Sequence, residues 1–133
     1  MSRMLEECTR VGKIWVVTVA GEPLGLTFKN DSNSLRELED ARTVPTEAAA
    51  QRVSKAFKAW IEDRFPGKST PKSQYWVAFP DAPIKVFPAR NPESEVIRRR
   101  NGNHFQDQGD AYTASQALRW LLKRERDMFE KVI

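Results

Sequence analysis

The chain contains two pairs of short β-type segments, and each pair precedes a long amphipathic segment. Lys13–Ala20 and Leu24–Lys29 flank a Gly-Glu-Pro turn in the first half, and Gln74–Phe79 and Ile84–Phe87 flank a Pro-Asp-Ala-Pro turn in the second. β-Branched and aromatic residues favour strands, whereas Gly and Pro favour the turns between strands. This ββα–ββα order predicts an α+β fold.

Two long helices are expected after the strand pairs. Thr46 is a suitable N-cap, apolar residues recur every three or four positions from Ala49 to Ile61, and Phe65-Pro66-Gly67 ends the segment. A capping box at Thr113–Gln116 predicts the start of a second helix near the end of the chain. We expect an antiparallel sheet of four to five strands with both helices on one face.

Shorter elements are less well defined by their sequence patterns. Residues 1–13 fit either a first strand or a frayed helix. Ser34–Glu37 forms a capping box, which predicts a short helix beginning there. Asn91-Pro92-Glu93 predicts another short helix, ending near Arg100.

The two halves of the chain resemble each other in outline. Trp15 precedes Phe28 across the first hairpin much as Trp76 precedes Phe87 across the second. A ββα–ββα pseudo-repeat is one explanation, and the general similarity of amphipathic hairpins is the other. The length of 133 residues predicts a single α+β domain over residues 1–133, with halves 1–67 and 74–133 joined by a short polar connector.

The composition excludes several classes of protein. One cysteine, Cys8, and one histidine, His104, exclude an internal disulfide and the usual zinc sites, so we expect no metal and no cofactor. Acidic neighbours make Cys8 a poor nucleophile. No apolar run reaches the length of a membrane helix, and no secretory signal is visible, so we expect a cytoplasmic protein with no membrane partner.

The net charge of +4 is spread unevenly along the chain. The positive excess falls in the two segments predicted as long helices, where basic residues recur at helical spacing. The expected basic rows are Arg52, Lys55 and Lys58 on the first helix, and Arg119, Lys123 and Arg126 on the second. Such rows suit phosphate backbones or acidic proteins, and ordinary solubilising charge is the alternative explanation.

The most distinctive motif is Arg98-Arg99-Arg100 followed by a polar loop. Three adjacent guanidinium groups suit bidentate phosphate contacts, and Asn103 and His104 in the loop would lie beside them. An acidic protein surface is an alternative partner, and a helix C-terminus that favours cations is an explanation without a partner. His104 with Asp107 would suit a small nuclease, but no metal-ligand spacing accompanies them.

A few individual side chains carry their own predictions. Glu125 projects into the apolar stripe of the last helix, so it should meet an arginine or lie at an interface. The tryptophans should lie in or beside the core, with Trp120 as the exposed exception. Tyr75 and Trp76 should point to opposite faces of their strand, which leaves one aromatic side chain for a partner or a second subunit.

These observations favour a small binding protein without enzymatic activity that contacts nucleic acid through a basic surface. The main alternative is a protein-interaction module, such as an inhibitor or assembly factor, that binds an acidic partner or itself. A small nuclease that uses His104 is a weaker alternative.

Overall fold

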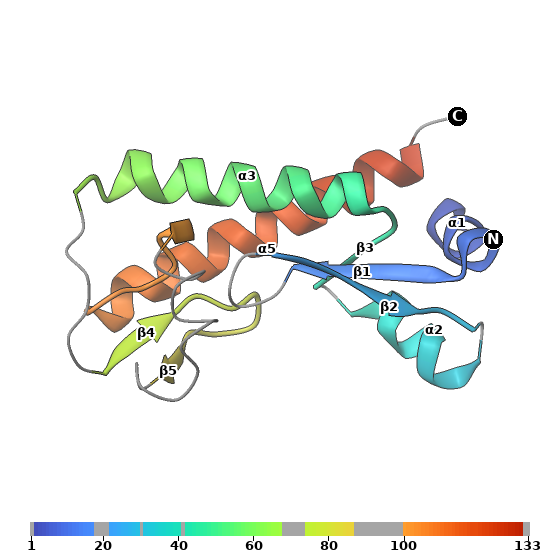
Figure 1. Ribbon diagram of the computed structural model, residues 1–133, viewed down its shortest axis with the longest axis horizontal. Coiled ribbons are helices and arrows are strands. Elements are labelled where there is room, and N and C mark those ends of the chain that lie inside the picture. The colour runs from blue at the N-terminus through green and yellow to red at the C-terminus, as the bar shows by residue number, and fades with distance from the viewer. Residues whose placement is uncertain are drawn as a thin grey trace.

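The computed structural model describes residues 2–17, 22–29, 31–40, 42–67, 74–86 and 100–131. Its elements are α1 (Arg3–Val11), β1 (Lys13–Val17), β2 (Pro23–Thr27), α2 (Ser32–Glu39), β3 (Thr43–Val44), α3 (Glu47–Arg64), β4 (Tyr75–Val77), β5 (Ile84–Val86) and α5 (Gln108–Lys131). The two long helices α3 and α5 pack against each other and lie over the strands, while α1 packs near the end of α5 (Figure 1). The predicted α+β class is therefore confirmed.

The strands form two small antiparallel sheets, so the predicted single sheet of four to five strands is wrong. The first sheet has the order β2-β1-β3, and the second consists of β4 and β5. β1 pairs with β2 on one side and with β3 on the other. β4 pairs with β5 and is bridged on its other side by Phe105, through Trp76 N–H and C=O at 2.7 and 2.8 Å. Because local partners occupy both edges of β1 and β4, neither strand has an edge left to join the two sheets.

The pseudo-repeat stays a prediction. The first hairpin pairs five residues with five, and the second pairs three with three. In addition, β3 follows α2 along the chain and extends the first sheet. The similarity between the halves is thus confined to a hairpin that precedes a long helix.

The main hydrophobic core joins both halves of the chain. It combines Val53 and Phe57 of α3 with Leu118 and Leu122 of α5, together with residues from the strands. Burial of these side chains supplies most of the driving force for helix–sheet packing. A second, smaller cluster lies beneath α1 and contains Met4, Cys8, Ile14 and Phe28.

The boundaries of α3 confirm the sequence pattern. Thr46 is the N-cap, and its hydroxyl oxygen accepts a hydrogen bond from Ala49 N at 3.1 Å. The helix ends at Arg64, before Phe65-Pro66-Gly67, because proline cannot continue the helical hydrogen-bond ladder.

The start of α5 differs from the prediction. The helix begins at Gln108 rather than at Thr113, and Asp107 Oδ1 accepts a hydrogen bond from Gly109 N at 2.7 Å. Asp107 O also accepts from Ala111 N, which is the first bond of the helix. Thr113 lies inside the helix and donates back to Gly109 O, so its side chain is not a cap. Asp107 therefore caps the helix.

The two shorter helices also refine the expectations. Residues before Lys13 form α1, and Glu130 of α5 accepts hydrogen bonds from Arg3 N and Met4 N at 2.9 and 3.0 Å. α2 begins at Ser32 and not at the predicted Ser34. The reason is that Asp31 acts as the N-cap, with its carboxylate accepting a hydrogen bond from Ser34 N. The predicted helix from Asn91 falls almost wholly outside the described residues.

Candidate functional site

The arginine triplet is only partly within the described structure. Arg98 and Arg99 lie outside the described residues, whereas Arg100 is exposed. Arg100 lines an open pocket of about 350 Å³ together with Glu62, Phe65 and His104. Because Glu62 brings an opposite charge to this pocket, Arg100 is not in a purely cationic environment.

Asn103 and His104 lie inside the molecule. Asn103 is 2% exposed, and its side-chain amide accepts from Ala78 N at 2.7 Å and donates to Ala78 O at 3.1 Å. It thus imitates a neighbouring strand beside the end of β4. His104 is buried, with its ring edge-on to Tyr75. Asn103 attaches the polar loop to the end of β4, and His104 packs against Tyr75 and lines the pocket beside Arg100.

Arg52 is held by an ion pair across the helices. Its Nε and Nη2 donate to the two carboxylate oxygens of Glu125 at 3.0 and 2.9 Å. The Glu125 side chain is 6% exposed, so this bidentate contact supplies the partner that a buried carboxylate needs. The hydrogen bond with Glu125 raises the pKa of Arg52. The expectation that Glu125 meets an arginine is confirmed, although the Arg52 side chain remains 60% exposed.

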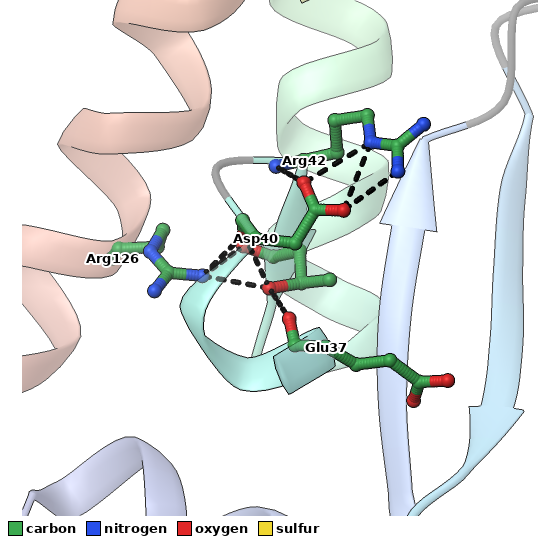
Figure 2. A network of polar contacts seen from close by, with 5 residues as sticks. Glu37, Asp40, Arg42 and Arg126 are labelled. Atoms are coloured by element: carbon green, nitrogen blue, oxygen red, sulfur yellow. Dashed lines mark hydrogen bonds and ion pairs between the residues drawn. The ribbon is translucent and has the colours of Figure 1, made fainter. Parts of the chain in front are cut away.

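Arg126 reaches from α5 to the end of α2 (Figure 2). Its Nη1 donates to Asp40 O, Thr43 O and Thr43 Oγ1, and its Nη2 donates to Leu38 O at 2.7 Å. A cation beside the last carbonyl groups of a helix is also favoured by the helix dipole. Burial lowers the pKa of Arg126, while the charge of Asp40 opposes that effect. This arginine therefore serves the fold.

Asp40 is itself paired on its other side. Its carboxylate accepts hydrogen bonds from Arg42 Nε and Nη2, the shortest at 2.6 Å (Figure 2). These hydrogen bonds lower the pKa of Asp40 and raise that of Arg42. Two arginines thus fix the chain between α2 and β3.

Arg119 also binds the backbone of another element. Its Nε donates to Pro80 O at 2.8 Å, and its Nη2 donates to Asp81 O at 3.0 Å. Arg119 and Lys123 are both exposed, but the printed contact of Lys123 stays on its own helix, where its ammonium group lies 3.0 Å from Asp127. The row is divided because Arg119 and Arg126 lie nearer the buried stripe of α5 than Lys123 does.

The outer face of α5 carries an exposed aromatic side chain among cations. Trp120 is 59% exposed, and the guanidinium of Arg124 lies over its ring at 4.8 Å from the centroid. Together they help line a shallow pocket of about 240 Å³. We call this pocket the Trp120 surface, and its residues are Trp120, Lys123, Arg124, Asp127, Met128 and Lys131. Three cations and one carboxylate give this surface a charge of 3 − 1 = +2.

The other three tryptophans differ from Trp120. Trp15, Trp60 and Trp76 are partly buried and pack against the main core. Each also has a lysine or arginine near its ring. Trp120 likewise has a cation over its ring, Arg124, but it is not among the residues of the core cluster. Its ring is therefore available for contacts outside the fold. The sequence singled out Trp120 and Lys123, whereas Arg124 could have been found from its i, i+4 spacing to Trp120.

Lys55 and Lys58 lie at a second polar pocket, of about 420 Å³. Ser54, Asn101 and Glu22 also line it, and the Glu22 carboxylate offsets part of the lysine charge. Ser54 Oγ is buried without a hydrogen-bond partner in the part of the chain that the structure describes. This pocket suits a small polar group, but it offers no aromatic surface.

Candidate metal clusters and membrane-spanning helices were sought in the described ranges. No cluster of three or more His, Cys, Asp or Glu side chains is placed to hold a metal ion there. Among the helices of the same ranges, none has the length and apolar character needed to cross a membrane. Comparisons with protein-family models, curated proteins and solved structures found no match.

Proposed function

We propose that this chain is a non-enzymatic binding protein that contacts nucleic acid through the basic outer face of α5. The observation that carries the proposal is an exposed tryptophan with an arginine over its ring, flanked by Lys123 and Lys131. Cations bind phosphates and aromatic rings stack on bases, so this combination suits a nucleic acid better than either feature alone. The cytoplasmic location expected from the sequence belongs to the same proposal.

The distribution of arginine contacts supports this choice of surface. Arg52, Arg119 and Arg126 are engaged within the fold by Glu125 or by backbone carbonyl groups. Among the described residues, Lys123 has an ion pair with the exposed Asp127 alone, and such surface ion pairs contribute little stability. A phosphate can therefore replace Asp127 at small cost. The outer face of α5 thus retains cations that a ligand can use.

The proposal is tested by salt-dependent binding of a fluorescently labelled oligonucleotide. The variant K123A/R124A/K131A should bind far more weakly at low salt. It should also reduce the slope of log affinity against log salt by about 2, because three phosphate contacts of roughly 0.7 each are lost.

A charge-matched control removes three exposed cations that do not line the Trp120 surface. The variant R10A/K29A/R36A has the same net charge as the test variant, and its substitutions lie on α1, after β2 and on α2. It should retain most of the binding, because the effect depends on the outer face of α5. Absence of binding by the unmodified protein at low salt would exclude the proposed function.

Protein interaction is a second candidate, favoured by a separate observation. Tyr112, Trp120 and Met128 are each more than half exposed on α5, at 53%, 59% and 53%. Large apolar side chains at a surface often mark a protein interface. Light scattering over a range of protein concentrations tests the simplest form, because self-association would raise the mass and W120A/M128A would lower it again.

The nuclease hypothesis has no such supporting observation. His104 is 7% exposed, and among the described residues it belongs to no cluster of three or more His, Cys, Asp or Glu side chains that could hold a metal ion. Metal-dependent cleavage that disappears in H104A remains the result that would favour it.

A further inference from the structure

We propose that the Trp120 surface takes single-stranded nucleic acid, with an unpaired base stacked on Trp120. This inference rests on the proposed function and adds the substrate class. It is carried by the placement of the indole, by the cation over its ring and by the charges that continue along the same helix face.

The first step concerns where Trp120 lies on α5. Leu118 is buried in the core, and a helix turns by about 100° per residue, so Trp120 lies about 200° away from it. The indole therefore lies on the ridge of the helix that is most remote from the core. Arg124 covers part of the ring, yet 59% of the residue remains accessible. A flat apolar surface is thus open to a ligand.

The second step concerns which nucleic acid could use that surface. In a duplex, each base is stacked between its neighbours, and inserting a side chain costs a few kcal/mol of stacking. In a single strand, the face of a base is free to stack on an aromatic side chain. Because Trp120 protrudes from a convex helix ridge, it suits an unpaired base, and Arg124 would strengthen the contact by polarising the ring from the other side.

The third step concerns the phosphates. Lys123 and Arg124 lie within about one turn of Trp120, and Lys131 lies eleven residues beyond it, or about 16 Å along the axis. At roughly 3.4 Å per stacked nucleotide, that distance corresponds to about five nucleotides. Five such spacings separate six nucleotides, so we expect a binding site of about six nucleotides. Affinity should rise with oligonucleotide length up to about that size and change little beyond it.

The experiment compares a labelled 12-nucleotide oligo-dT with the corresponding dA·dT duplex by fluorescence anisotropy at low salt. We expect the single strand to bind at least 10-fold more tightly than the duplex. W120A should weaken single-strand binding about 10- to 100-fold, and W120F should retain most of the affinity, since phenylalanine can also stack. Oligo-dT should quench the tryptophan fluorescence of the unmodified protein, and W120F should lose most of that quenching.

A matched control is Y112A, which removes another exposed aromatic residue from the same helix. It should leave single-strand binding unchanged. Equal binding of both forms, with W120A indistinguishable from the unmodified protein, would overturn the single-strand inference and leave the proposed function intact. No binding of either form would overturn both. A W120A variant that binds DNA normally but loses self-association would assign the surface to a second copy of the chain and overturn the inference.

Discussion

At the scale of single residues, the surrounding structure decides whether a cation is available to a partner. Arg119, Lys123 and Arg126 are equivalent in a helical spacing pattern, yet the two arginines bind backbone carbonyl groups of other elements, whereas the lysine contacts Asp127 of its own helix. Arg126 offers the clearest test, because it donates four hydrogen bonds to the last turn of α2 and to the segment that follows it.

Removal of Arg126 should destabilise the fold. We expect R126A to lower the free energy of unfolding by about 2–4 kcal/mol, because the carbonyl groups of Leu38 and Thr43 lose a charged donor. R126K should restore only part of that loss, since lysine lacks the planar fork. Urea denaturation measures the effect. R124A on the outer face of the same helix is the control and should change stability by less than about 0.5 kcal/mol.

Cys8 should be unreactive in the native protein. Burial, followed by the charge of Glu7, raises the pKa of the Cys8 thiol to about 11. A raised pKa means that the thiolate forms only at higher pH, so at pH 8 the reactive fraction is very small. Reaction with a disulfide reagent at pH 8 should be at least 100-fold slower in the folded chain than in urea. Equal rates would show that α1 opens readily.

At the scale of elements, the sequence predicted α3 well and α5 less well. Thr46 has no competitor as N-cap, whereas Asp107 caps α5 ahead of the capping box at Thr113. The apolar periodicity after Thr113 was sufficient to predict the helix itself. The sequence assigns Asn101–Gly109 to a polar loop, and the last two of these residues, Gln108 and Gly109, belong to the first turn of α5. Helix existence was therefore easier to predict than the helix boundary.

The two candidate caps make different predictions. D107A should lower stability by about 1 kcal/mol, because Gly109 N loses its acceptor at 2.7 Å. T113A should change stability by less than about 0.5 kcal/mol, because the hydroxyl only returns a hydrogen bond to Gly109 O. Paired urea curves measure both. A larger effect for T113A would restore the start predicted from the sequence.

At the scale of the whole molecule, the two halves share one core. Val53, Phe57 and Ile61 from the first half pack in the same cluster as Leu118 and Leu122 from the second. The Arg52–Glu125 ion pair and the contact of Arg126 with Thr43 also join the halves. The sequence predicted a single domain whose halves, 1–67 and 74–133, are joined by a polar connector, but the connector carries no information about shared burial.

The shared core predicts cooperative folding. The full chain should unfold in a single transition, whereas a fragment comprising residues 1–67 should show no cooperative transition, because α3 would expose the face that α5 covers. Circular dichroism during urea denaturation measures both proteins. A fragment that unfolds cooperatively would instead support two independent halves.

The sequence by itself determined the α+β class, the two hairpins and the two long helices, the need of Glu125 for a partner and the exposure of Trp120, because periodicity and turn chemistry act over a few residues. The tertiary structure decided the pairing of strands into two sheets, the burial of Asn103 and His104 and the choice of which cations face outward. Those outcomes depend on contacts such as Arg126 with Thr43, between residues far apart in the chain. No local sequence pattern specifies such contacts, because several cations of the chain could bind any one buried carbonyl group or carboxylate. Which cation binds it depends on how the helices and strands pack against one another.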